Sequence, residues 1–571
     1  MAQEKSPGDI EKGPIAATPD SSVHDKEAAM TTEIVCNFDD DDIVAEYKLF
    51  PGIPWIRRHR VIIFKVAFLL WSTVHWITGL VFHSHDKNWL IPFLIWLCII
   101  LRYFFWYVSS KYVSDTIYWV WARTGIAVYD RIPPRLRTPL GALVAIAAVV
   151  VGTFVSPENE DNTRANRAIS LVGIIIVIFV FWFFSRSRQH VKWRTVIVGM
   201  LAQYIIGLFV LRTSVGYNIF KFIADRAADL LECSKSGVSF LTSDDVANLP
   251  WFFIGVIPAI IFFISLVQVL FHLGFIQWFV RKIAIFVFWS LEASGAEAVV
   301  VAATPFVGQG ESAMLVRPFV PYMTNSEIHQ ILTCGFATIS GSVLVGYIGL
   351  GLNAEAMVSS CIMSIPASIA ISKLRYPELK ETLTAGKVVI PEDKEHKAKN
   401  GLHAFANGAW LGIQIGGTII ASLICILAVV TLINNLLTWW GHYLNIEEWT
   451  LQLSLSYLLW PVTFLLGVNH EKGDVFKNEY KAFSLLSGDP RWADLSPRSQ
   501  LIATYALCGF GNIGSLGIQI GIISQLAPSR GGDVARLAVS ALISGIMATL
   551  TSASIAGLVV TDQLSHFVKS T

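Results

Sequence analysis

The sequence predicts an all-α polytopic membrane protein, with about 11 transmembrane helices and two re-entrant helical hairpins in inverted repeats. First, 54% of the 571 residues are hydrophobic and only 15% are charged. Second, apolar runs long enough to cross ~30 Å of hydrocarbon recur along most of the chain. Third, two further apolar stretches are interrupted by proline, glycine and polar residues, which simple spanning helices do not explain.

Residues 1–45 form a polar segment that ends in four aspartates at 39–42. A segment of this composition cannot bury enough apolar area to fold alone, so we expect a disordered cytoplasmic tail. No basic start with a short apolar segment precedes the first span, which we therefore expect to be retained and not cleaved as a signal peptide. Behind the tail we expect three N-terminal transmembrane helices within 46–167 and a helical membrane core over 168–571.

Apolar runs predict the spanning helices, and the charges of the loops orient them. Loops rich in lysine and arginine lie at 57–60, 111–137 and 186–194, whereas the loops at 83–88 and 157–167 are neutral or acidic. The positive-inside rule then places the N-terminus in the cytoplasm and the C-terminus outside. The expected spans are 61–82, 89–108, 138–156, 168–184, 195–212, 251–271, 325–349, 354–372, 404–440, 499–525 and 534–562.

Two re-entrant hairpins are expected near 285–323 and 451–487. The first stretch contains Pro305 and further prolines and glycines, and the second is broken at Pro461 and Gly467 before it becomes polar. A helical hairpin that enters and leaves on one side accommodates such breaks, because non-helical backbone at membrane depth must be buried in protein or line an aqueous cavity. Two kinked spanning helices are the alternative.

Residues 217–234 and 275–292 place charges at helical spacing among aromatic and aliphatic side chains. This pattern is typical of helices that lie along the membrane interface. Ordinary packing against the bundle is the alternative.

A span interrupted at its middle follows each expected hairpin. Residues 333–346 (TCGFATISGSVLVG) and 504–520 (TYALCGFGNIGSLGIQI) both place Gly, Ser and Thr inside an apolar run. Such breaks are typical of discontinuous helices whose freed backbone groups face a binding cavity. Because the combination occurs twice and the two hairpins would enter from opposite sides, we expect inverted repeats. Packing of small residues against neighbouring helices is the alternative for each break.

Polar side chains gather on these interrupted elements. Gln309 and Glu311 lie at the turn of the first hairpin, Glu479 lies in the second, and Asn512 and Ser515 lie in the second broken helix. An ionisable group at membrane depth costs roughly 3 kcal/mol or more, so such groups are usually functional. Together with apolar walls, these side chains suit a neutral, polyhydroxylated, partly planar ligand.

Structural roles are the alternatives for two of these residues. Glu311 could form a buried ion pair with Arg317, six residues further on. Asn512 could be a helix cap beside Gly511 and Gly514.

Other function classes find less support in the sequence. The net charge of +1 gives no basic surface for a nucleic acid. His75 and His272 have no partner at the spacing of a metal site or of a nucleophile and base, so an enzyme is not expected. A channel needs a continuous pore, whereas two opposed hairpins form two gates. The cysteines in apolar segments, none of them in a CxxC pair, are expected as small buried hydrophobes.

Three strings in these regions resemble a known family. GQGESAMLVRPFVPYMTNSEIHQILTCGFATISGS at 308–342 and LSPRSQLIATYALCGFGNIGSLGI at 495–518 closely resemble the two signature regions of the concentrative nucleoside transporters. NEYKAF at 478–483 matches the second-hairpin motif of that family. The likeness runs from about 168 to 562, and the three extra N-terminal spans with their tail look like the eukaryotic branch.

The resemblance implies a symporter that imports nucleosides across the plasma membrane on a cation gradient, as a homotrimer in the lipid bilayer with an elevator mechanism. Gly310 stands where the family usually has Ser or Thr, which is expected to change the preference between purines and pyrimidines. The remaining chemistry fits, since carboxylates accept from vicinal hydroxyls and an aromatic wall stacks on a planar base. By motif position, the nucleobase group is Gln309, Gly310, Glu311, Val343 and Phe510, and the ribose group is Glu479, Asn512 and Ser515.

The coupling ion is the second point where the chain departs from the family pattern. Sodium-coupled members carry Asn-x-x-Val-Gly-Gln before the hairpin tip, whereas residues 304–309 read TPFVGQ. Because threonine is shorter than asparagine and Pro305 restricts the backbone, we expect coupling to protons, with Glu311 as the carrier. Sodium is the alternative, and no other cofactor is expected. The resemblance puts the sodium ligands at Thr304, Val307, Thr338 and Ile339.

Overall fold

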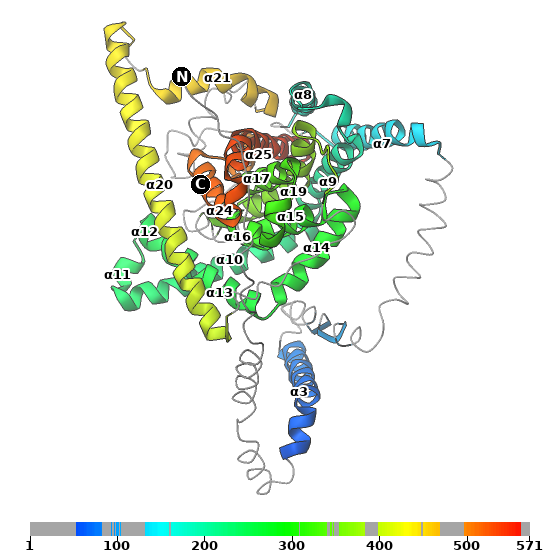
Figure 1. Ribbon diagram of the computed structural model, residues 1–571, viewed down its shortest axis with the longest axis vertical. Coiled ribbons are helices and arrows are strands. Elements are labelled where there is room, and N and C mark those ends of the chain that lie inside the picture. Colours follow the sequence, from blue (N-terminus) through cyan, green and yellow to red (C-terminus); the bar gives the residue numbers. More distant parts are fainter. Residues whose placement is uncertain are drawn as a thin grey trace, which may run out of the picture. The chain divides into compact units, whose positions relative to one another are not determined.

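Every regular element in the described part of the chain is a helix, which confirms the all-α class (Figure 1). The structure is a computed structural model that describes residues 53–82, 93, 96, 97, 99–101, 103, 132–158, 162–249, 251–307, 309–339, 343, 344, 347, 353–382, 398–446, 449–468 and 496–560. The chain divides into two compact units, residues 1–131 and 132–571. The helices are α3 (Ile53–Phe82), α7 (Pro134–Phe154), α8 (Arg164–Phe183), η2 (Arg188–His190), α9 (Trp193–Arg212), α10 (Ser214–Leu241), α11 (Asp244–Ala247), α12 (Phe252–Gly255), α13 (Ile257–His272), α14 (Phe275–Leu291), α15 (Gly295–Val307), α16 (Gln309–Met314), η3 (Arg317–Tyr322), α17 (Asn325–Ala337), α19 (Ala354–Arg375), α20 (Gly401–Tyr443), α21 (Leu451–Leu466), α23 (Pro497–Leu507), α24 (Ile513–Leu526), η5 (Pro528–Arg530) and α25 (Gly531–Val559).

The first unit contains α3, whose C-terminal part is apolar. Trp76 stacks on Trp96 with ring centroids 4.2 Å apart, and Trp96 Nε1 donates to Thr73 Oγ1 over 3.1 Å. The first expected span therefore packs against the segment that holds the second.

Seven helices of the described part are long and apolar enough to cross a membrane. They are 136–154, 164–183, 193–212, 253–272, 354–375, 401–421 and 528–559, each of which overlaps an expected span. Of the other four expected spans, 61–82 falls on a shorter apolar helix, 325–349 and 499–525 are broken, and most of 89–108 lies outside the described residues.

The centre of the second unit is formed by α19 and α25, around which α8, α9, α17 and α23 pack (Figure 1). In the spanning part of α19, 78% of the residues are buried, and in that of α25 72%, against 6% in α7. Hydroxyl and amide groups join these helices: Gln203 Nε2 donates to Ser552 Oγ over 2.7 Å, and Ser364 Oγ lies 2.9 Å from Ser552 Oγ. Short polar side chains allow the backbones to approach closely, as in other membrane bundles.

The helix α20 packs antiparallel to α13 through a stripe of glycines at every fourth residue. A Cβ on Gly408 would lie 2.6 Å from the Cα of Ser265, and one on Gly412 would lie 2.7 Å from the Cα of Ile261. Only glycine allows so close an approach of two helix backbones. With 43 residues, α20 is roughly 65 Å long, which exceeds the thickness of a bilayer core.

The first hairpin is formed by α15 and α16, which pack against each other. It is shorter than the expected 285–323, because residues 275–291 form the separate helix α14. That helix ends at Leu291, and its C-cap Glu292, whose backbone is left-handed (φ 52°), turns the chain before α15 begins. Thr304 Oγ1 lies 3.2 Å from Ser312 Oγ and so ties the two arms together.

Both expected broken helices are present. The helix α17 ends at Ala337, and Thr338 is extended, before helical backbone returns at 343. In the second case α23 ends at Leu507 and α24 begins at Ile513. The second hairpin begins with α21, but residues 469–495 lie outside the described residues.

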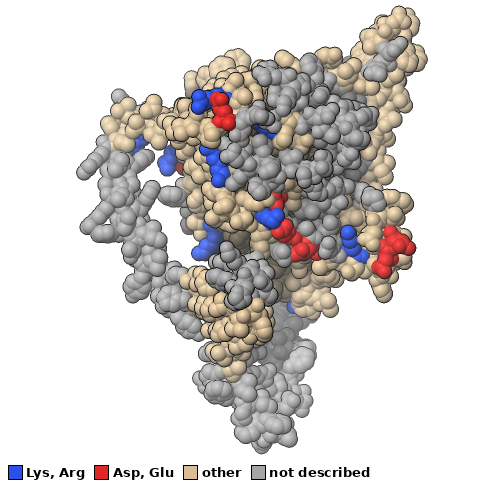
Figure 2. Space-filling model, turned by 180° about the vertical axis from the view of Figure 1, so that it is seen from behind, with Lys and Arg blue, Asp and Glu red and all other residues tan. Residues whose placement is uncertain are grey.

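The expected interfacial segments are helical: 217–234 lies within α10, and 275–292 corresponds to α14. Their position at a membrane interface stays a prediction. On the face seen in Figure 2, charged side chains of the described residues are sparse and most of the described surface is uncharged, as expected for a chain that faces lipid.

Candidate functional site

The two helix breaks lie next to each other. A Cβ on Gly509, in the second break, would lie 3.3 Å from the backbone oxygen of Phe336 at the end of α17. Thr549 of α25 links them, since its Oγ1 is 3.4 Å from Ala337 O and would be 2.5 Å from that same Cβ. Backbone groups freed from both helices therefore face one region, as expected for a binding site between two repeats.

An apolar wall joins the same two breaks. Val343 and Phe510, both expected against the face of a nucleobase, belong to one cluster of packed side chains. The other members are Ile339, Leu344, Tyr347, Met357, Cys361 and Cys508. The structure thus brings together two residues that are 167 positions apart.

Asn512 and Ser515 form the N-cap of α24. Asn512 Oδ1 accepts from Ser515 N over 2.8 Å, and Ser515 Oγ accepts from Asn512 N over 3.1 Å. Asn512 is therefore a helix cap, which was the structural alternative for this residue. The cap uses only the amide oxygen, so the amide nitrogen can still donate to a ligand. Ser515 is buried, and its hydroxyl donates to backbone oxygens. Their contacts with a ribose stay a prediction.

Gln309 begins α16 at the tip of the first hairpin, where it meets a residue that the sequence did not single out. Gln519 Nε2 donates to Gln309 Oε1 over 2.8 Å, and Gly335 of α17 lies against both side chains. The only sequence signal for Gln519 is an amide within an apolar run.

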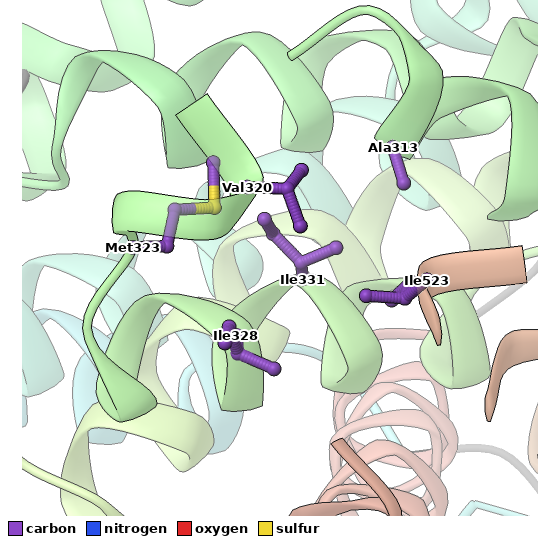
Figure 3. Close-up of a pocket in the computed structure, with 6 residues that line it drawn as sticks. All are labelled: Ala313, Val320, Met323, Ile328, Ile331 and Ile523. Carbon is purple, nitrogen blue, oxygen red and sulfur yellow. The ribbon is translucent and has the colours of Figure 1, made fainter. Parts of the chain in front are cut away.

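One helical turn away from this pair, apolar side chains fill the space between four helices. They belong to α16, η3 and the residue that follows it, α17 and α24, and they face one another in Figure 3. They are Ala313, Val320, Met323, Ile328, Ile331 and Ile523.

Two of the residues expected to hold a cation, Thr304 and Thr338, lie next to Cys334. The hydroxyl of Thr304 donates to Val300 O over 2.7 Å and lies beside the Cys334 thiol. Thr338 Oγ1 donates to Cys334 O over 2.9 Å, and Thr304, Thr338 and Ile339 are each 1% exposed. Val307 ends α15, on the same hairpin arm as Thr304.

The remaining expected site residues lie outside the described side chains. Gly310 and Glu311 are part of α16, but their surroundings, and the pairing of Glu311 with Arg317, are not described. Glu479 lies within 469–495. Their roles stay predictions.

A buried charge cluster at the base of the first hairpin was also not predicted from the sequence. Lys373 Nζ lies 2.5 Å from Glu297 Oε1 and donates to Ser326 Oγ over 3.0 Å. Glu378 completes it, with Lys373 Nζ 3.6 Å away. A cavity of about 710 Å³ adjoins the cluster, away from the two breaks. The partners come from three separate segments, so their sequence spacing gives no signal.

Three family models match the second unit of the chain. The model described as "Na+ dependent nucleoside transporter C-terminus" matches residues 356–557, and the corresponding N-terminus model matches 172–245. The model described as "Nucleoside recognition" matches residues 253–353.

Curated proteins and solved structures give the same result. "Solute carrier family 28 member 3" of Eptatretus stoutii is 37% identical, over 70% of this chain and 62% of that protein. "Sodium/nucleoside cotransporter 2" of Rattus norvegicus is 34% identical, over 73% and 66%. The chain thus matches slightly less than two thirds of the length of these relatives. A structure of CNTnw in an inward-facing substrate-bound state shares 31% identity and a TM-score of 0.63, over 69% of this chain and 97% of that one. CNTnw variants in outward-facing and intermediate states are similar too.

These findings correct the expected coupling ion. Two of the matching family models are described as Na+ dependent, and the rat relative is a sodium/nucleoside cotransporter. Thr304 in place of the asparagine does not exclude sodium, because a hydroxyl oxygen can coordinate a hard cation as an amide oxygen does. Coupling to protons, with Glu311 as the carrier, is therefore abandoned.

Proposed function

Because this chain belongs to the concentrative nucleoside transporter family, we propose that it is a sodium-coupled symporter that imports nucleosides across the plasma membrane. The observation that carries this proposal is the meeting of two broken helices at an apolar wall, with amide side chains beside it. An uncharged nucleoside needs such a mixture of stacking surface and hydrogen-bonding groups, and it needs no basic clamp.

We propose that the wall receives the flat base and the polar groups read its edges and the sugar. Phe510 and Val343 offer the apolar surface, and Gln309 offers an amide at the hairpin tip. The free amide nitrogen of Asn512 can donate to a ribose hydroxyl while its oxygen caps α24. In this proposal Glu311 contacts the base, and Glu479 and Ser515 contact the ribose.

Sodium is proposed to bind beside the first break. The proton of the Thr304 hydroxyl points to Val300 O, which leaves oxygen lone pairs for a cation. The backbone is extended at Thr338, so carbonyl oxygens at this break are freed from the bonds that a continued helix would make. Sodium bound between α15 and α17 would fix the hairpin tip that carries Gln309, so ion and nucleoside would favour each other's binding.

Alternating access is proposed to follow an elevator mechanism in a homotrimer. The likeness to CNTnw in inward-facing, intermediate and outward-facing states supports a chain that exposes its site to each side in turn. The N-terminus is proposed to lie in the cytoplasm and the C-terminus outside.

Uptake of radiolabelled uridine in cells that lack nucleoside transport tests the proposal. We expect saturable uptake that is lost when external sodium is replaced by choline and that does not depend on external pH. Uptake that persists in choline would overturn sodium coupling, and the absence of uptake of any nucleoside by protein at the cell surface would overturn the transport function.

A further inference from the structure

Gln519 of α24 lies directly against a residue that the proposed function places at the nucleobase. Its Nε2 donates to Gln309 Oε1 over 2.8 Å. Gln519 is 2% exposed, whereas Gln309 is half-buried at the hairpin tip. Any effect of Gln519 on a ligand therefore passes through Gln309.

Three helices hold this amide pair in register. Gln309, Gly335 and Gln519 come from α16, α17 and α24 and lie in contact. Residues four positions apart share one face of a helix, so the next turn of each helix continues the same contact. Those next-turn residues are apolar and line one small space (Figure 3): Ala313, Ile331 and Ile523.

Gly335 leaves the room that Gln519 occupies. A Cβ at position 335 would lie 1.9 Å from Gln519 Nε2 and 3.0 Å from Gln309 Cβ. Real atoms do not approach so closely, so any side chain there would displace Gln519 from Gln309. The position of Gln519 is thus built into the packing of α17.

The hydrogen bond between the two amides can run in either direction. Within the described residues, Gln519 Oε1 is buried and accepts no hydrogen bond. Turning both amides over exchanges Oε1 and Nε2 in each side chain without moving any other heavy atom, and makes Gln309 Nε2 donate to Gln519 Oε1. Each arrangement has one hydrogen bond between the two amides, so the number of hydrogen bonds favours neither arrangement.

The two arrangements present different groups of Gln309 to a ligand. In the first, Gln309 Oε1 is engaged and its Nε2 offers N–H groups; in the second, Nε2 is engaged and Oε1 is offered. We infer that Gln519 is a positioning residue that lets Gln309 bind either a carbonyl oxygen or an amino group on the edge of the base. This inference rests on the proposed function. The substrate class then includes nucleosides of both kinds, such as uridine and cytidine, which differ by a carbonyl and an amino group.

The test compares uridine and cytidine uptake in wild type, Gln519→Glu and Gln519→Met. An ionised glutamate at 519 only accepts, so Gln309 must donate to it and present Oε1 to the base. Because burial favours the protonated acid, which can also donate, the ratio is measured over a range of external pH up to about 8.5. We expect the ratio of uridine to cytidine uptake efficiency to fall about fivefold or more, the effect of one misdirected hydrogen bond. Methionine removes the partner, so KM should rise for both nucleosides while the maximal rate and the ratio change little. Ile523→Val, one turn further along the same face, should keep the wild-type ratio.

The outcomes distinguish a failure of the proposed function from a failure of the inference about Gln519. Wild type that transports neither nucleoside ends the proposed function and the inference with it. Wild type that transports only one of them, or a Gln519→Glu ratio equal to that of wild type, overturns the inference alone. If the glutamate variant does not reach the surface, Gln519→Met decides: unchanged KM values for both nucleosides overturn the inference.

Discussion

Replacing Thr304 by valine removes one oxygen from the proposed sodium site without changing the size of the side chain. The side chain is 1% exposed, its hydroxyl donates to Val300 O over 2.7 Å, and it lies 3.2 Å from Ser312 Oγ on the other hairpin arm. Valine fills the same volume, so no cavity forms. The change therefore acts on the hydroxyl alone.

The expected magnitude follows from two separate losses. The contacts of the hydroxyl with Val300 O and Ser312 Oγ are together worth about 1 to 2 kcal/mol of folding stability, which the protein should tolerate. Interactions of a neutral oxygen with a charged partner are worth about 1.5 to 3 kcal/mol, so the sodium concentration for half-maximal uptake should rise by roughly tenfold or more. The maximal rate at saturating sodium should change much less.

The assay is uridine uptake over a range of sodium concentrations, with Thr333→Val as the matched control. Thr333 is also buried and donates to the carbonyl four residues earlier, His329 O, over 2.7 Å. Thr333→Val loses the same kind of hydrogen bond, at a side chain that bonds His329 and is not among the residues proposed to hold the ion. An unchanged sodium dependence for Thr304→Val, or an equal change in both variants, would refute the assignment of Thr304 to the ion.

Three further changes test the structure. Asn512→Asp keeps a good helix cap but loses the amide N–H groups, so it should abolish uridine uptake at normal surface expression; wild-type uptake would show that Asn512 is only a cap. Gly412→Ala should cost about 1 to 3 kcal/mol of stability through overpacking and so lower the melting temperature of the purified protein. Gly417→Ala, with open space around its Cβ, should not lower it, and equal effects of the two substitutions would contradict the packing of α13 on α20. Copper phenanthroline should join Cys361 and Cys508, whose Sγ atoms lie 3.6 Å apart, and a lack of the cross-linked peptide in mass spectrometry would contradict this contact.

Local sequence signals predicted the interrupted elements. Proline and glycine near 305–310 mark the first hairpin, and the runs at 333–346 and 504–520 mark both breaks. These features depend on the conformational preferences of neighbouring residues, so the sequence carries them directly. The bounds of the elements were less well predicted. The first hairpin is shorter than expected, since the apolar run before Glu292 contains no proline or glycine that would indicate the turn there.

Contacts between distant segments could not be predicted in the same way. Gln519 and Gln309 are 210 residues apart, and Lys373 lies 76 residues after Glu297. Spacing in the sequence says nothing about such pairs, since they depend on how whole helices pack. The prediction of proton coupling was wrong for a related reason: an ion site depends on all the oxygens that packing brings together, and Thr304 is only one of them.

Nucleoside accumulation in proteoliposomes tests the central claim most directly. Purified full-length protein is reconstituted, and radiolabelled uridine is supplied at equal concentration on both sides of the membrane. With sodium outside only, we expect uridine to accumulate inside above its external concentration, and with equal sodium on both sides we expect no accumulation. Accumulation driven by a pH gradient without sodium, or equilibration that never exceeds the external concentration under a sodium gradient, would contradict sodium-coupled symport.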